Sequence, residues 1–317
     1  MSIICMVKMD EKPRISWLLQ GDVSLQYQVY RDLLGEERKD LQARIGSEGW
    51  GKAFLSQRKP EGHWGDRFYQ PKWISTHYTL LDLRNLNLDP HNQLAQASIQ
   101  QVLQTLKAED GGIQLGPSTA HRSDVCVNGM FLNYAAYFQA PEKALQSIVD
   151  ALLHEIMPDG GFNCRSTRSG ARHSSLHSTI SVLEGLFQFQ KLGHTYRKHD
   201  VSAAIQRAET FILIHRFFLS DRTGQIIHPD FLKLRYPCRW KYDILRAFDY
   251  FQDARRTWDR RMEEGIAVLL QKRNKDGTWN LQAAHPGKVH LIMEQAGQAS
   301  RWNTLRAMRV LKHFGKM

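Results

Sequence analysis

The stretch Asp159-Gly-Gly-Phe162 recurs, with small changes, at four other places in the chain. The related turns are Glu61-Gly-His-Trp64, Asp110-Gly-Gly-Ile113, Asp221-Arg-Thr-Gly-Gln225 and Asp276-Gly-Thr-Trp279. Their first glycines stand at positions 62, 111, 160, 224 and 277, so the steps between turns are 49, 49, 64 and 53 residues. A turn that recurs at this spacing indicates a repeat protein.

The segments between the turns have the periodicity of amphipathic helices. Apolar residues recur at three- and four-residue steps, as in Leu94, Ala97 and Val102, and again in Ala144, Ile148 and Ala151. The turn glycines can adopt the positive φ at which a chain leaves a helix, and the apolar residue after each turn can fold back onto the helices. Each unit is therefore expected to contain a turn, a helix, a short link and a second helix.

This pattern predicts an all-α fold of about five or six helical hairpins in one structural domain. Residues 1–50 depart from the period, and we expect them to form a helical capping unit packed on a repeat domain of residues 51–317. Terminal units of repeat proteins are usually atypical because they shield an open face.

Composition excludes several classes of protein. The chain has 317 residues, of which 42% are hydrophobic and 24% charged, which is typical of a folded protein and not of a disordered or fibrous one. No stretch approaches the roughly 18 apolar residues of a membrane span. Residues 1–10 have too short an apolar core for a secretory signal, so we expect a cytoplasmic location.

Cysteines and basic residues give weaker indications. The four cysteines, Cys5, Cys126, Cys164 and Cys238, lie far apart, which favours reduced thiols over a disulfide framework. The net charge of +11 comes from basic residues scattered along the chain, and this does not predict binding to nucleic acid.

Over roughly residues 50–317 the sequence resembles the α/α-toroid superfamily of terpenoid cyclases and protein prenyltransferase β subunits. The resemblance rests on the acid-Gly-x-aromatic turns ending at Trp64, Phe162 and Trp279, on the repeat period, and on polar helix starts such as Ser75-Thr-His-Tyr-Thr79. It implies an α/α toroid in which inner helices ring a central cavity and outer helices surround them. It also implies isoprenoid substrates and leaves open a partner subunit.

The resemblance further implies a zinc site. Protein prenyltransferases hold zinc with an Asp-x-Cys at the start of one inner helix and a histidine on the next, which Asp124-Val-Cys126 and His177 match. Zinc accepts carboxylate, thiolate and imidazole ligands, and three protein ligands leave one position open. The alternative is structural: Asp124 caps a helix, Cys126 is a small buried residue and His177 is a buried histidine.

Four further residues are expected to line the cavity. His77 and Cys126 each follow the first glycine of their turn by 15 residues, so they should occupy equivalent places on neighbouring inner helices. Tyr242-Asp-Ile-Leu-Arg-Ala247 aligns with Trp302-Asn-Thr-Leu-Arg-Ala307. The candidate ligand-binding residues are thus His77, Trp240, Tyr242 and Trp302, with packing in the core as the alternative. Asp124, Asp243 and His77 are the candidates for catalysis.

The leading prediction is a prenyltransferase-like or terpenoid-cyclase-like protein that holds an isoprenoid or other apolar ligand in a central cavity. The acidic Asp-x-Asp-Asp motif of the cyclases is absent, so full squalene cyclisation is not expected. One alternative is a non-catalytic ligand-binding or scaffold protein of the same fold. Another is a glycan-processing α/α-toroid enzyme, for which Asp124 and Asp243 would have to form the pair of carboxylates. The sequence leaves open whether the protein is an enzyme.

Overall fold

The computed structural model describes residues 11–114, 122–165 and 169–317, and these are mostly helical, as predicted. The α-helices are α1 (Lys12–Leu19), α2 (Val23–Gln28), α3 (Lys39–Arg44), α4 (Gly49–Leu55), α5 (Thr76–Asn85), α6 (Gln93–Thr105), α7 (Val125–Tyr137), α8 (Glu142–His154), α10 (Leu176–Lys191), α11 (Lys198–Ile214), α12 (Ile244–Asp253), α13 (Glu263–Gln271) and α14 (Arg301–His313). Shorter helical turns are η2 (Val29–Leu34), η3 (Lys72–Ile74), η4 (Pro229–Leu232) and η5 (Arg260–Met262). Within the described residues, strands β1 (Trp279–Asn280) and β2 (Ala299–Ser300) form one small antiparallel sheet.

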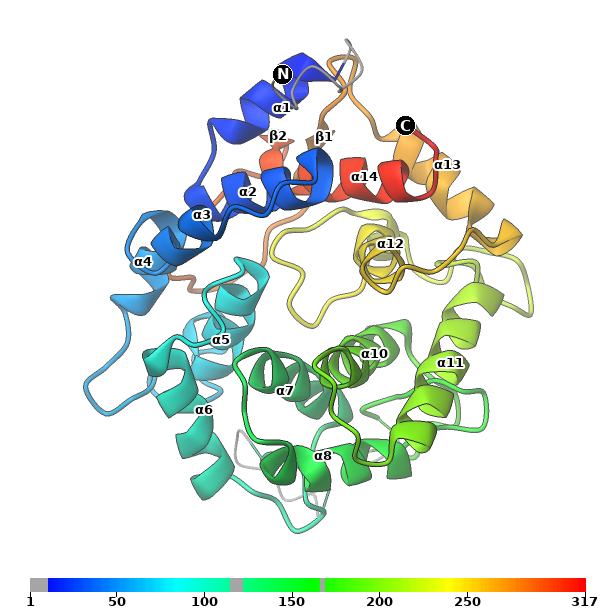
Figure 1. Cartoon of the computed structure of the whole chain (residues 1–317). Coiled ribbons are helices and arrows are strands. Elements are labelled where there is room, and N and C mark those ends of the chain that lie inside the picture. Colours follow the sequence, from blue (N-terminus) through cyan, green and yellow to red (C-terminus); the bar gives the residue numbers. More distant parts are fainter. Residues whose placement is uncertain (1–10, 115–121, 166–168) are drawn as a thin grey trace.

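The helices lie in two layers around a common centre (Figure 1). The inner helices are α5, α7, α10, α12 and α14, and α6, α8, α11 and α13 lie outside them. Three successive pairs of inner helices contact each other, α5 with α7, α7 with α10 and α12 with α14, and α14 also packs against η2 near the start of the chain. The segment between η4 and α12, drawn in yellow, runs through the centre of the picture.

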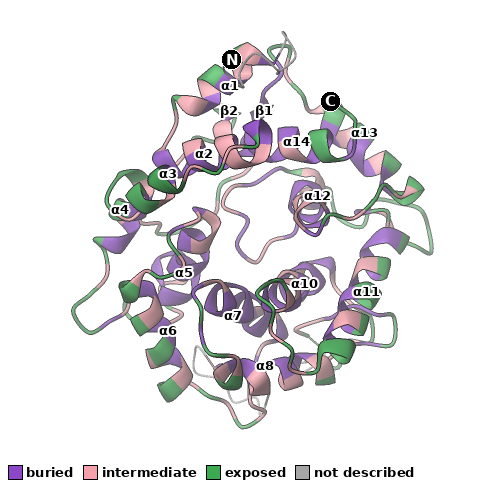
Figure 2. Ribbon diagram, in the orientation of Figure 1, coloured by how far each residue is buried: buried purple, intermediate pink, exposed green. Residues whose placement is uncertain are grey.

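Burial follows the two layers (Figure 2). Most residues of α7 and α10 are buried, because each inner helix has neighbours on several sides. Outer helix α8 instead buries one stripe, Leu145, Ile148, Val149 and Leu152, and exposes its opposite face. In the described parts of the chain, no helix is long and apolar enough to cross a bilayer.

The repeated turns have the backbone conformation that the sequence predicted. The first glycine of every turn has positive φ, with values of 94° at Gly62, 85° at Gly111, 94° at Gly160, 66° at Gly224 and 83° at Gly277. Side chains other than glycine rarely adopt this conformation. A backbone hydrogen bond to the residue three positions earlier closes four of the turns, for example from the N–H of Gly160 to the carbonyl of Met157, whereas the N–H of Gly224 donates to the carbonyl of Ser220.

The residue that follows four of these turns is buried and is held by the next inner helix. Its backbone N–H donates to a side-chain oxygen there: Trp64 to Thr76 (2.9 Å), Ile113 to Asn128 (2.7 Å), Phe162 to Thr179 (3.0 Å) and Trp279 to Thr304 (3.0 Å). The indole N–H groups of Trp64 and Trp279 also donate to carbonyls ten residues earlier, those of Phe54 and Leu269. The turn at Gly224 differs, because Ile226 and Ile227 after it are exposed.

Candidate functional site

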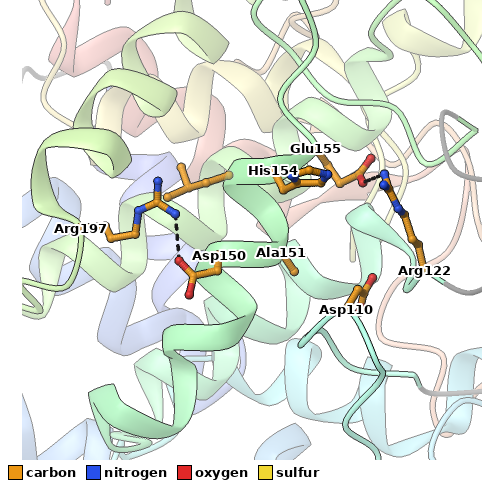
Figure 3. A pocket seen from close by; sticks show the side chains of 8 residues that line it. Asp110, Arg122, Asp150, Ala151, His154, Glu155 and Arg197 are labelled. Carbon is orange, nitrogen blue, oxygen red and sulfur yellow. Dashed lines mark hydrogen bonds and ion pairs between the residues drawn. The ribbon is translucent and has the colours of Figure 1, made fainter.

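The structure contains a groove on its outer surface, along α8 (Figure 3). It has a volume of about 700 Å³ and is lined by Asp110, Arg122, Asp150, Ala151, Leu153, His154, Glu155 and Arg197. Its charged groups pair with one another, Arg122 with Glu155 at 2.7 Å and Arg197 with Asp150 at 2.9 Å. These pairs join neighbouring surface segments, and none of the candidate residues named above lines the groove.

A second hollow, the central cavity, lies among the inner helices and has a volume of about 710 Å³. Its walls come from η2, α5, α7, α10, α12 and α14, mostly from their C-terminal halves, as with Arg84 and Asn85 of α5 and Tyr137 of α7. Tyr236, Cys238 and Arg239, from the segment that crosses the centre of the fold, line it as well.

The lining of the central cavity is strongly cationic. Four carboxylates line it, those of Asp32, Glu184, Asp249 and Asp253. Eight cationic side chains line it, those of Arg31, Arg84, Lys191, Arg239, Arg246, Arg255, Arg306 and Arg309. Such an excess of positive charge in a partly enclosed space favours an anionic ligand.

Ion pairs connect the walls of this cavity. Arg309 of α14 donates to Asp32 of η2 at 2.7 Å and to Asp249 of α12 at 2.6 Å. Arg306 also donates to Asp249, at 3.0 Å. Burial alone would raise the pKa of Asp249, but the guanidinium groups of Arg309 and Arg306 hold it below its usual range. Asp249 is therefore a charged structural link and not a proton donor.

Arg84, unlike Arg306 and Arg309, has no carboxylate partner among the described residues. Its guanidinium donates to the side-chain oxygens of Gln188 at 3.0 Å and Asn85 at 3.3 Å, and lies 5.8 Å from the ring centre of Tyr137. Its Nε has no hydrogen-bond partner, and none of the described carboxylates forms an ion pair with it. Arg84 thus places at the cavity wall a positive charge that none of the described carboxylates neutralises.

Aromatic side chains cover other parts of the cavity wall. Trp302 stacks on Tyr236 with ring centres 4.4 Å apart and planes 11° apart. Tyr137, Phe187 and Tyr250 also line the space. Of the four residues expected to bind a ligand, Trp302 lines the central cavity.

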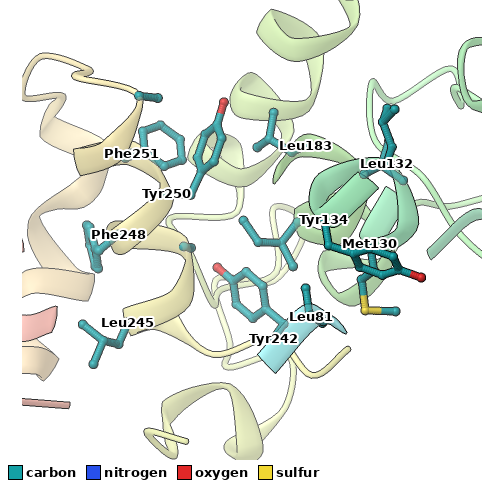
Figure 4. Close-up of a cluster of buried hydrophobic side chains, with 14 of the residues drawn as sticks. Leu81, Met130, Leu132, Tyr134, Leu183, Tyr242, Leu245, Phe248, Tyr250 and Phe251 are labelled. Carbon is teal, nitrogen blue, oxygen red and sulfur yellow. The ribbon is translucent and has the colours of Figure 1, made fainter. Parts of the chain in front are cut away.

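The other three residues that were expected to bind a ligand do not line the central cavity. Tyr242 is fully buried and donates its hydroxyl to the carbonyl of Phe217 at 2.5 Å, among the apolar residues of Figure 4. His77 is buried beside Tyr134, with Nδ1 3.1 Å from the tyrosine hydroxyl, and burial lowers its pKa to about 3. Trp240 packs on the ring of His177. All three therefore contribute to packing in the structure.

The two candidate acids begin helices. Asp243 is buried at the start of α12, where its carboxylate accepts the N–H of Arg246 at 2.9 Å. Burial raises the pKa of Asp243, and nearby Arg306 opposes this. Asp124 precedes α7, as predicted, and its backbone carbonyl accepts the side-chain amide of Asn128 at 3.0 Å. Neither Asp124 nor Asp243 is among the residues that line the central cavity.

The predicted zinc ligands have other partners. The Nδ1 atom of His177 accepts the backbone N–H of Tyr242 at 2.8 Å, and burial lowers the pKa of His177 to about 4. The N–H of Cys126 donates to the sulfur of Cys164 at 3.0 Å. Among residues 11–114, 122–165 and 169–317, no group of three or more His, Cys, Asp or Glu side chains is placed to hold a metal.

Zinc binding through Asp124, Cys126 and His177 therefore stays a prediction. Elemental analysis of untagged protein tests it directly: stoichiometric zinc is expected in the parent and is expected to be lost in Cys126→Ala. A parent protein without zinc would contradict it. Substituting Cys238→Ala provides the matched control, because that cysteine lies in the wall of the central cavity.

Comparison of the sequence with known protein families finds no matching family, and comparison with curated proteins finds no match. The resemblance to α/α-toroid proteins therefore rests on the repeated turns, their spacing and the polar helix starts of the sequence alone.

Most arginines of the central cavity were not predicted from the sequence, although a signal was present. The aligned strings that end at Ala247 and Ala307 share Leu-Arg-Ala, and their arginines, Arg246 and Arg306, both line the cavity.

Proposed function

We propose that the two helical layers form an α/α toroid related to the terpenoid cyclases and protein prenyltransferases, and that its central cavity binds an anionic isoprenoid-like ligand such as a prenyl diphosphate. The arrangement of inner and outer helices supports the first part. The combination of arginines and aromatic rings in one cavity supports the second.

The observation that carries this proposal is the twofold excess of cationic over carboxylate side chains in the cavity lining. Guanidinium groups bind phosphate oxygens with paired hydrogen bonds, and aromatic faces such as Trp302 and Phe187 suit a hydrocarbon chain. A volume of about 710 Å³ lies within the range of small-molecule sites. A purely hydrocarbon ligand fits less well, because it would remove water from many charged groups without replacing their hydrogen bonds.

A second candidate is a non-catalytic binding protein with the same ligand. Each carboxylate of the lining is in an ion pair: Asp32 and Asp249 with Arg309, Glu184 with Arg246, and Asp253 with Lys191. Groups held in this way are poorly suited to give or take a proton during a reaction. Product analysis after incubation with farnesyl diphosphate separates the two candidates, since a carrier returns the ligand unchanged.

Replacing Arg84 with glutamine is expected to weaken the binding of farnesyl diphosphate by about ten- to one-hundredfold, because one or two charge-assisted hydrogen bonds to the diphosphate are lost. Isothermal titration calorimetry measures this. Farnesol and inorganic pyrophosphate, titrated separately, report the contributions of the hydrocarbon chain and the anion.

The matched control is Arg255→Gln, which removes an exposed cation at the edge of the same cavity and is expected to change affinity by less than about twofold. Equal weakening by both substitutions would point to general electrostatic attraction and would contradict a specific site at Arg84. Binding of farnesol as tightly as farnesyl diphosphate would contradict an anionic ligand.

A further inference from the structure

Two cysteines far apart in the sequence meet at the start of α7. Cys126 lies in the first turn of that helix, and Cys164 lies 38 residues later, in the segment that leads to α10. The N–H of Cys126 donates to the sulfur of Cys164 at 3.0 Å. Both residues are half-buried.

Neighbouring groups fix the position of Cys164 from a third segment. Its backbone N–H donates to the hydroxyl of Ser178 on α10 at 3.1 Å, and that hydroxyl lies 3.4 Å from the sulfur. The sulfur is thus held between the first turns of α7 and α10. The sulfur of Cys164, 3.0 Å from the backbone nitrogen of Cys126, lies within about 4.5 Å of the Cα atom of Cys126. The two cysteines therefore lie side by side, as a disulfide requires.

We infer that Cys126 and Cys164 form a reversible disulfide. With glutathione disulfide as oxidant, one protein thiol loses its proton and attacks a glutathione sulfur, which releases one glutathione and leaves a mixed disulfide. The second protein thiol loses its proton and displaces the remaining glutathione. Two protein thiols are oxidised to one S–S bond, and one glutathione disulfide is reduced to two glutathione molecules.

This inference is independent of the proposed ligand, because neither cysteine lines the central cavity. The bond would join the start of α7 to the segment before α10 and close a loop of residues 126–164, which includes α8 and all of α7 except Val125. It would also consume the thiol of Cys126, so an oxidised chain is expected not to use that residue as a zinc ligand.

The experiment uses the full chain, treated with a chelator to remove metal from the thiols and then equilibrated with glutathione buffers of increasing oxidising strength. Intact mass is expected to fall by two hydrogens, and peptide mapping is expected to join Cys126 to Cys164. Dithiothreitol should restore the original mass. Cys126→Ser and Cys164→Ser should each abolish the joined peptide, whereas Cys238→Ser, at a buried thiol held near Asp243, should leave it unchanged.

Circular dichroism of each serine variant establishes that it folds before its result is used. Stable glutathione adducts on Cys126 or Cys164 in the parent, without the joined peptide, would overturn the inference. So would a joined peptide that contains Cys5 or Cys238 in place of either partner. Ligand affinity is not measured here, so this test can fail while the proposed function stands, and the converse also holds.

Discussion

Replacing Asp249 with asparagine is expected to lower the free energy of unfolding by about 3–5 kcal/mol, as measured by chemical denaturation. The Asp249 carboxylate accepts hydrogen bonds from Arg306 at 3.0 Å and from Arg309 at 2.5 and 2.6 Å. Asparagine has the same shape but no charge, and its amide nitrogen cannot accept a hydrogen bond. The buried guanidinium groups of Arg306 and Arg309 would lose the carboxylate that they share. Leaving a buried charge without this partner destabilises a protein by more than the intact ion pair stabilises it.

The same carboxylate is expected to make stability depend on pH in a defined acidic range. Arg309 and Arg306 hold the pKa of Asp249 in the folded protein below its usual value, against the effect of burial. The stabilisation is therefore complete above the usual carboxyl pKa of about 4 and is lost as the pH falls through the lower pKa of the folded state. Below that usual value, Asp249→Asn should lose stability less steeply than the parent on acidification.

Asp253→Asn is the control for charge alone. Asp253 also lines the cavity, but its pair with Lys191 is exposed, and exposed pairs contribute at most about 1 kcal/mol. Equal losses of stability in Asp249→Asn and Asp253→Asn would contradict a special role for the buried pairs.

Trp279→Ala is expected to lower the free energy of unfolding by about 3–5 kcal/mol, the range for removal of a large buried aromatic side chain. Trp279 is 1% exposed and follows the last of the repeated turns. Its indole N–H donates to the backbone carbonyl of Leu269 in α13 at 2.8 Å, and its backbone N–H donates to the side-chain hydroxyl of Thr304 in α14 at 3.0 Å. The side chain therefore joins an outer helix to an inner helix, and thermal or chemical unfolding measures its contribution.

Two variants separate the components of this effect. Trp279→Phe keeps much of the ring and removes the indole hydrogen bond, so a smaller loss of about 1–3 kcal/mol is expected. Trp258→Ala removes a tryptophan that is 38% exposed and should cost clearly less than Trp279→Ala. A loss in Trp258→Ala as large as that in Trp279→Ala would show that the buried turn residue has no particular importance.

Much of the fold follows from local features of the sequence. A glycine such as Gly160 marks a backbone conformation that other residues avoid, and the helix periods around it report which faces are buried, so both were predictable. The central cavity was not, because its lining depends on which faces of several separate segments converge. Arg84 and Arg309 lie 225 positions apart in the sequence and line the same space, and no local pattern marks that meeting.

The expected site residues show the same limit. His77 was placed by its spacing from the preceding turn and Tyr242 by its alignment with Trp302, but neither pattern tells whether a side chain faces a cavity or a packed neighbour. Cys164 was passed over because sequence separation hid its contact with Cys126. Both cases need the tertiary arrangement, since the contacts join different repeat units.

The link from Arg309 to Asp32 has a consequence for how the chain folds. The two residues are 277 positions apart, yet their side chains lie 2.7 Å from each other. Neighbouring repeats can pair as soon as both have been synthesised, but this contact must wait for α14, near the end of the chain. Contacts of such high order slow folding because the entropy of a very long loop is lost before the contact forms. During synthesis, the first helical segments are thus expected to remain without this partner until α14 has been made.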